Sequence, residues 1–228
     1  MDKGEQYPPS LGRTSPYRDD KSVDALERLS GRVAEPFRAY RPKDFSSVTR
    51  AELHAFSDTS QDAIGTAVYL RQLNEANEVS MALVYGQARA APLNPTSIPR
   101  LELCAAVLAV QAAQRVIKEI DLKISDVIYY TDSKVVLGYI TNESRQFYVY
   151  VANRVELIRS TSTPEQWRYV ETDLNPADLA RHGVPSSKLM ETSWLVGPEF
   201  LRKLERTLPT NEMFVLVASD VQRQCKYA

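Results

Sequence analysis

Residues 53–85 read LHAFSDTSQDAIGTAVYLRQLNEANEVSMALVY, and this stretch decides the class of fold. In residues 53–57, apolar residues alternate with small or polar ones, a pattern that predicts a strand ending at Asp58. After a turn-like segment, residues 64–70 are rich in β-branched and aromatic residues and predict a second strand. A short connection leads into a third predicted strand at residues 79–85. Three successive strands joined by short turns predict an antiparallel meander.

The sequence after this meander alternates helical and strand patterns. Pro99 suits the first turn of a helix over residues 100–120, which is apolar around most of its circumference and is therefore expected to be well buried. The other expected elements are strands at 127–130 and 166–170, and helices at 132–140, 148–160 and 176–181. This order predicts an α/β fold, in which a mixed five-stranded sheet carries helices on its faces.

The composition is that of an ordinary globular protein. The 228 residues are 43% hydrophobic and 25% charged, with 28 basic and 29 acidic side chains. A net charge so close to zero excludes a polybasic nucleic-acid binder and an acidic disordered tail protein. Cys104 and Cys225 cannot form a disulfide scaffold and fit a reducing compartment. Since no signal sequence or membrane-spanning stretch is visible, we expect an intracellular protein, cytoplasmic or nuclear, that is not secreted.

The character of the sequence divides the chain into three parts. Residues 1–49 are polar and contain several prolines, so we expect a partly disordered N-terminal segment. Residues 50–183 hold the strand and helix patterns and form the predicted domain. Residues 184–228 are expected to be a linker or tail, in which Trp194–Leu201 is apolar enough to pack against some other surface.

Four acidic residues fall at the ends of predicted elements, namely Asp58, Glu102, Asp132 and Asp178. Open α/β sheets bind ligands at the carboxyl edge of their strands. Carboxylates gathered at such an edge repel one another unless cations neutralise them. An all-oxygen donor set suits Mg²⁺ or Mn²⁺ better than zinc, and two such ions about 3.5–4 Å apart can support phosphoryl transfer. The residues alone leave open an alternative, in which each acid is a helix cap or a solvated surface group.

Four motifs that contain these acids occur in an order that is similar to a known family. They are Phe56-Ser57-Asp58-Thr59-Ser60, Pro99-Arg100-Leu101-Glu102-Leu103, Tyr130-Thr131-Asp132-Ser133 and Asn175-Pro176-Ala177-Asp178-Leu179-Ala180. Together they resemble the ribonuclease H domain of BEL/Pao-type LTR retrotransposon Pol polyproteins, over about residues 38–201. The resemblance implies a ribonuclease H-like fold, with three antiparallel strands, two parallel strands and helices on both faces of the sheet.

The resemblance also implies a function. It implies that the four acids form the catalytic set and bind two Mg²⁺ ions, with Mn²⁺ as the alternative ion. Asp58 would bridge both ions, Glu102 and Asp132 would complete one site, and Asp178 would help the other. The implied reaction is hydrolysis of the RNA strand of an RNA–DNA hybrid, and a reverse transcriptase of the same element is a candidate partner. Many cellular ribonucleases H carry a histidine before the fourth acid, whereas residues 167–175 of this chain contain none.

The charge of the predicted domain bears on how it would bind a substrate. Residues 50–183 carry 13 basic and 16 acidic side chains, which predicts weak and strongly salt-dependent binding of nucleic acid. Lys134, Arg145 and Arg154 are the candidates for phosphate contacts, although a solvated helix face is the commoner role of such residues.

Two other functions compete with nuclease activity. The first is a catalytically silent, truncated retroelement fragment that at most binds nucleic acid or protein, because no integrase pattern follows the domain. The second is an integrase-like transposase, which is disfavoured because that class uses a glutamate as its last ligand.

Overall fold

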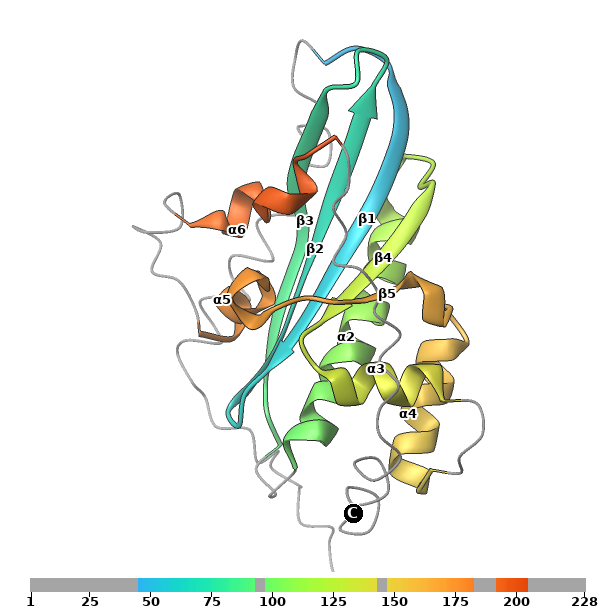
Figure 1. Cartoon of the computed structure of the whole chain (residues 1–228), viewed down its shortest axis with the longest axis vertical. Coiled ribbons are helices and arrows are strands. Elements are labelled where there is room, and N and C mark those ends of the chain that lie inside the picture. Colours follow the sequence, from blue (N-terminus) through green and yellow to red (C-terminus); the bar gives the residue numbers. More distant parts are fainter. Residues whose placement is uncertain (1–44, 93–96, 143–146, 183–191, 205–228) are drawn as a thin grey trace, which may run out of the picture.

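The computed structural model describes residues 45–92, 97–142, 147–182 and 192–204. Its centre is a five-stranded sheet with the strand order β3-β2-β1-β4-β5. The strands are β1 (Val48–Thr59), β2 (Ala63–Asn74), β3 (Val79–Ala90), β4 (Asp126–Thr131) and β5 (Trp167–Tyr169). The first three are antiparallel neighbours, whereas β4 pairs with β1, and β5 with β4, in parallel (Figure 1). The predicted mixed sheet is therefore confirmed.

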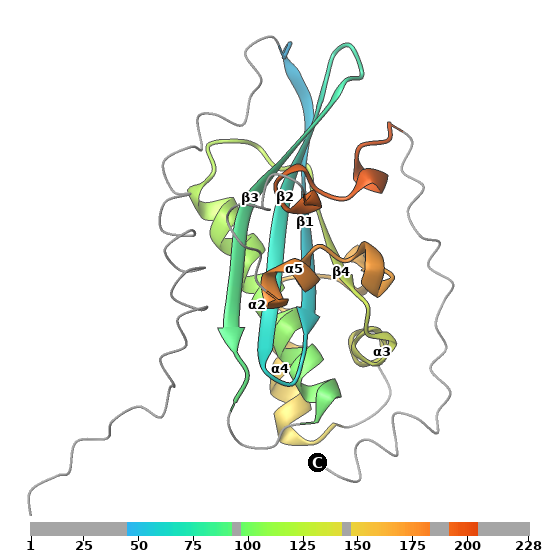
Figure 2. The same cartoon turned by 90° about the vertical axis from the view of Figure 1, so that its left-hand side faces the viewer.

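Helices cover both faces of this sheet. They are α2 (Ile98–Glu119), α3 (Lys134–Thr141), α4 (Val149–Arg159), α5 (Ala177–His182) and α6 (Ser193–Val196), with 3₁₀ turns at Pro164–Gln166, Thr172–Leu174 and Glu199–Leu201. Figure 2 shows α2 behind the strands and α5 in front of them. None of the helices in the described residues is long and apolar enough to cross a membrane. The expected disordered segment up to residue 44 and most of the expected tail lie outside the described residues.

The first three strands extend beyond the apolar stretches that predict them. β1, β2 and β3 each span twelve residues, because the backbone ladder begins earlier in β1, at Val48, and continues to Asn74 in β2 and to Ala90 in β3. The β2–β3 connection closes at Asn77, which has a positive φ of 60°. Its partner Asn74 accepts a hydrogen bond from the Glu78 backbone N–H at 2.8 Å. Asparagine suits both positions, because its side chain bonds to nearby backbone and it tolerates the left-handed conformation.

Alternation along β1 divides the apolar side chains between two cores. Ala51, Leu53 and Ala55 pack in the core beneath α2, whereas Phe56 belongs to a second core on the opposite face. Small residues let α2 approach the sheet closely, and five of its alanines are buried: Ala105, Ala106, Ala109, Ala112 and Ala113. The second core is more aromatic, and the Phe56 ring stacks on that of Tyr130 with centroids 4.4 Å apart.

A larger side chain on the buried face of α2 should therefore destabilise the protein. Ala109 is fully buried, so Ala109→Leu should lower the free energy of unfolding by about 1–3 kcal/mol. Gln111→Leu is the matched control, because Gln111 is exposed on the same helix and should change stability by less than about 0.5 kcal/mol. Urea denaturation of both variants measures the difference, and equal midpoints would contradict the packing described for α2.

Candidate active site

Two of the four acids lie at the ends of adjacent parallel strands. The register pairs Ser57 of β1 with Thr131 of β4, so that the residues that follow, Asp58 and Asp132, reach the same edge of the sheet. Asp58 is 5% exposed, and its Oδ1 accepts a hydrogen bond from the Thr59 backbone N–H at 2.7 Å. Asp132 is half-buried. These two carboxylates are therefore fixed by the sheet itself.

Glu102 is joined to this edge through a serine. It is the fifth residue of α2, and its Oε2 accepts a hydrogen bond from Ser133 Oγ at 2.6 Å. Ser133 follows Asp132 in the chain and is the N-cap of α3, where its Oγ accepts from the Val136 N–H at 3.2 Å. One hydroxyl therefore connects α2, the end of β4 and the start of α3.

Asp178 is brought toward β1 by a buried asparagine. Asn175 is 3% exposed, and its Nδ2 donates to the Ser57 carbonyl oxygen at 2.9 Å. Its Oδ1 accepts from the Ala177 N–H, and the Asp178 N–H donates to its backbone carbonyl. The start of α5 is thereby attached next to Asp58.

The surroundings of Glu102 favour its neutral form. Burial raises the pKa of Glu102 and the nearby Asp132 carboxylate raises it further, while the Ser133 hydrogen bond acts in the opposite direction. Asp132 itself accepts a hydrogen bond from Thr172 Oγ1 at 3.0 Å. Within the described residues neither carboxylate forms an ion pair with Lys, Arg or His. In the described residues, the side-chain donors to these two carboxylates are hydroxyl groups, which do not neutralise their charge.

The donor chemistry of this edge fits a hard divalent cation. Carboxylate oxygens are the ligands that Mg²⁺ prefers, and it needs only one or two from the protein because it keeps several waters. In the described part of the chain, no three or more His, Cys, Asp or Glu side chains are grouped so that they could hold a metal ion together. The carboxylates of this edge are ligands of the type that Mg²⁺ prefers, but the described side chains do not form a closed three-ligand cage.

The candidates for phosphate contacts have different positions. Lys134 is the first residue of α3, and its Nζ lies 5.2 Å from the centroid of the Tyr169 ring. Arg154 lies on α4, with its Cζ 3.5 Å from the centroid of the Tyr150 ring. Arg145 lies outside the described residues.

The sequence analysis missed a second arginine at this tyrosine. Arg100, near the start of α2, lies over the Tyr150 ring with its Cζ 4.8 Å from the centroid. Cys104, one helical turn further on, is partly exposed, and its Sγ accepts from Arg154 Nε at 3.3 Å. The two guanidinium groups form no ion pair with a carboxylate in the described residues. The spacing of Tyr150 and Arg154, four residues apart on a helix, is the sequence signal that could have indicated this cluster.

Ser133, Thr172 and Asn175 were also missed as supporting residues. Ser133 and Asn175 belong to motifs that the sequence analysis quoted, but their hydrogen-bond partners lie 31 and 118 residues away. Local patterns do not report contacts over such separations.

Comparison with known proteins identifies the family. The model of the Pao retrotransposon-like RNaseH-like domain matches residues 20–133, which is half of the chain and includes the first three acids. This match and the mixed five-stranded sheet define a ribonuclease H-like domain. More particularly, the chain belongs to the family of Pao retrotransposon RNase H-like domains, as the motifs indicated.

Among solved structures, RNase H1 from the archaeon Halobacterium salinarum is 14% identical, with a TM-score of 0.36 over 56% of this chain and 90% of its own. An N-terminal RNase H domain from Mycobacterium tuberculosis is 8% identical, with a TM-score of 0.32 over 54% of this chain and 84% of its own. LC11-RNase H1 in complex with an RNA/DNA hybrid is 9% identical, with a TM-score of 0.33 over 64% of this chain and 94% of its own. The curated proteins contain no significant match. The family assignment rests on the sequence match alone.

The raised pKa of Glu102 has a consequence for stability. Folding favours the protonated form, so the stability that Glu102 contributes is present at low pH and is lost as the pH rises through its folded-state pKa. Glu102→Gln keeps an acceptor for Ser133 without the charge. We therefore expect this variant to be at least as stable as the wild type at pH 7. The difference in stability between the two proteins should shrink toward about pH 4, where glutamate is protonated. Thermal unfolding in metal-free buffer between pH 4 and pH 8 tests this, and a variant that melts below the wild type at pH 7 would contradict it.

Proposed function

We propose that this chain is a divalent-metal-dependent endoribonuclease that hydrolyses the RNA strand of RNA–DNA hybrids. The observation that carries this proposal is the position of Asp58 and Asp132 at the ends of adjacent parallel strands. Ser133 connects Glu102 to the same edge, and Asn175 connects the start of α5 to it. Membership of the Pao RNase H-like family supports the same activity.

The four acids would hold two Mg²⁺ or Mn²⁺ ions. Bound ions would supply charge neutralisation and a nucleophilic water for in-line attack on a phosphodiester. The protein's own contribution is to hold the carboxylates in place: Ser133 orients Glu102, and Thr172 orients Asp132. Because hydroxyls do not neutralise a carboxylate, they leave its negative charge available to a cation.

The cluster of Arg100, Tyr150 and Arg154 supports a phosphodiester substrate. Two guanidinium groups that face one ring, without a carboxylate partner in the described residues, attract an anion. Burial raises the pKa of Tyr150 to about 12, so the ring between them remains neutral. Arg100 is two residues before Glu102, so the cluster lies at the same end of α2 as Glu102, although residues two apart point to different sides of a helix. We assign phosphate binding to these arginines and to Lys134. Phosphate binding by Arg145 stays a prediction.

A binding module without catalysis is the second candidate function. It is favoured by the absence, within the described residues, of a group of three side chains able to hold a metal ion. Such a protein would bind the hybrid through its arginines but would leave it intact. Binding and cleavage must therefore be measured separately.

Removing one carboxylate charge tests the proposed chemistry. Asp132→Asn should reduce cleavage of a labelled RNA–DNA hybrid in Mg²⁺ by at least about 100-fold, the order expected when a group that stabilises transition-state charge is lost. With Mn²⁺ in place of Mg²⁺, Asp132→Asn should also cleave the hybrid more slowly than the wild type. Product analysis on a denaturing gel measures the rate.

Asp126→Asn is the matched control for this substitution. Asp126 begins the same strand at its opposite end, where its Oδ1 accepts from the Val127 N–H at 2.8 Å. We expect this variant to cleave within about twofold of the wild type, because asparagine can accept the same hydrogen bond. A wild-type protein that binds the hybrid but cleaves no faster than Asp132→Asn would refute the nuclease and leave the binding module.

The arginine cluster makes a separate prediction about binding. Arg154→Ala should weaken hybrid binding and reduce the slope of log K against log salt by about one, because one phosphate contact is lost. Arg115→Ala is the control, because Arg115 also lies over a tyrosine, Tyr85, but near the other end of α2. Fluorescence anisotropy at several salt concentrations measures both slopes. Equal slopes for the two variants would remove Arg154 from the substrate site.

A further inference from the structure

Residues 192–204 lie on the sheet, although the sequence analysis assigned them to a linker or tail. This 192–204 segment contains α6 and the 3₁₀ turn Glu199–Leu201, joined through Gly197, which has a positive φ of 74°. Figures 1 and 2 show it beside α5, on the face of the sheet opposite α2. Its apolar residues explain this position, because Leu201 is fully buried. The segment is therefore part of the folded unit.

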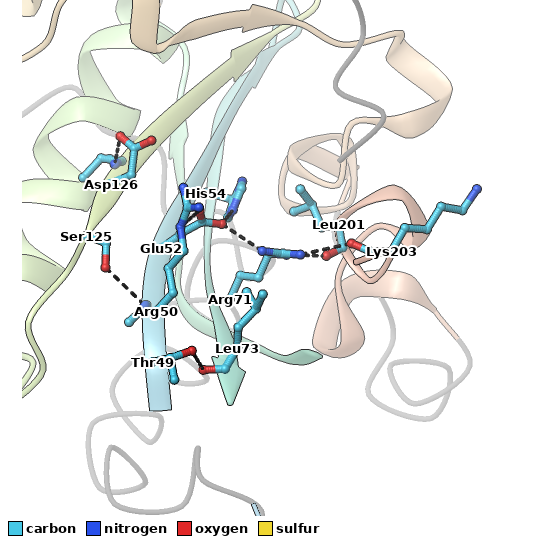
Figure 3. A network of polar contacts seen from close by, with 12 residues as sticks. Thr49, Arg50, Glu52, His54, Arg71, Leu73, Ser125, Asp126, Leu201 and Lys203 are labelled. Carbon is cyan, nitrogen blue, oxygen red and sulfur yellow. Dashed lines mark hydrogen bonds and ion pairs between the residues drawn. The ribbon is translucent and has the colours of Figure 1, made fainter. Parts of the chain in front are cut away.

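A buried arginine holds the end of the 192–204 segment. Arg71 on β2 is 1% exposed, and it donates from Nε to the Leu201 carbonyl at 2.8 Å and from Nη2 to the Lys203 carbonyl at 3.0 Å (Figure 3). Its Nη1 donates to Glu52 Oε2 at 3.0 Å, and Glu52 is also fully buried. Arg50 approaches the other Glu52 oxygen at 2.6 Å. Because a buried guanidinium needs its donors satisfied, the two carbonyl oxygens complete this network.

Aromatic contacts hold the rest of the segment. The Phe200 ring meets the rings of Phe56 and Tyr130 edge-on, with centroids 6.3 and 5.9 Å apart. Tyr69 donates from its hydroxyl to the Trp194 carbonyl at 2.8 Å. A Cβ atom at Gly86 would lie only 2.7 Å from the Trp194 ring, so β3 accepts this indole because it carries a glycine there. These contacts lie on the same face as the Arg71 network.

The same apolar core connects the segment to α5. Leu201 and Ala177 belong to one cluster, together with Phe56 and Tyr130 of the sheet. Ala177 is the first residue of α5 and directly precedes Asp178. With six residues, α5 is too short to be stable without packing. Its position therefore depends on packing in this core, which the 192–204 segment helps to close, together with the Asn175 hydrogen bonds.

We propose that the 192–204 segment is a positioning element for α5 and thereby for Asp178. Docking of the segment places Phe200 against Phe56 and Tyr130 and buries Leu201 in the core that Ala177 also joins, and Arg71 fixes that docking. The segment acts on the acidic edge only through α5. The catalytic consequence rests on the proposed nuclease function, whereas the physical coupling between the segment and α5 does not.

Hydrogen exchange of the full-length chain tests this coupling. In Leu201→Ala, the amides of residues 177–180 should exchange at least about tenfold faster, while those of β4 should change by less than about twofold. Leu204→Ala is the matched control, because Leu204 is 51% exposed in the same segment and should leave α5 unchanged. In the cleavage assay with Mg²⁺, Leu201→Ala should lower kcat more than it raises KM for the hybrid, because the substrate contacts are left in place.

Gly86→Ala is a second variant, in which the added methyl group on β3 should displace Trp194. It tests the coupling between the segment and α5 if Leu201→Ala does not fold. Faster exchange in both the 192–204 segment and α5 supports the proposal. Faster exchange in the segment with unchanged α5 overturns it. If the wild type does not cleave the hybrid, the nuclease proposal fails, but the exchange result still decides whether the segment positions α5.

Discussion

The parallel pairing of β1 with β4 is the constraint on which the rest of the site depends. It places the carboxyl ends of two central strands side by side, with Ser57 opposite Thr131. Asp58 and Asp132 reach the same edge because backbone hydrogen bonds fix this register, and a slip by one residue would turn every side chain of a strand to the other face. The helices attach to this edge through side-chain hydrogen bonds. Ser133 connects Glu102 of α2 to it, and Asn175 connects α5 to it.

The element types were predictable because they depend on local patterns. Alternation predicted the strands of the meander, and the continuous apolar surface of residues 100–120 predicted a buried helix, which the structure has at 98–119. The approximate ends of the elements were also visible, so the four acids could be assigned to element ends from the residues around them. The assignment of these acids to a metal-dependent nuclease site came from the family motifs and stays a proposal.

The contacts that the sequence did not indicate are those between distant polar residues. Glu52 and His54 occupy positions on β1 where alternation predicts only that they share a face, and nothing nearby indicates that both are fully buried. Their burial depends on Arg71 and Tyr130, with Tyr130 Oη 3.1 Å from His54 Nδ1. Arg71 in turn needs carbonyl oxygens 130 and 132 residues further along the chain. A buried charge of this kind is stable only when the whole fold supplies its partners, so local sequence patterns cannot predict it.

One face of β1 shows two different solutions to the same electrostatic problem. At one end, Glu52 is fully buried, and Arg50 and Arg71 neutralise it within the protein. At the other end, Asp132 follows β4 beside the end of β1, and Glu102 and Asp132 receive hydroxyl hydrogen bonds, without an ion pair in the described residues. Internal neutralisation makes the first cluster a structural element, because two guanidinium groups pair with its one carboxylate and leave no negative charge for a cation. The nearby Asp132 carboxylate disfavours the charged form of Glu102, and a divalent cation would relieve that repulsion. This difference is the physical reason for describing the first cluster as structural and for proposing catalysis at the second.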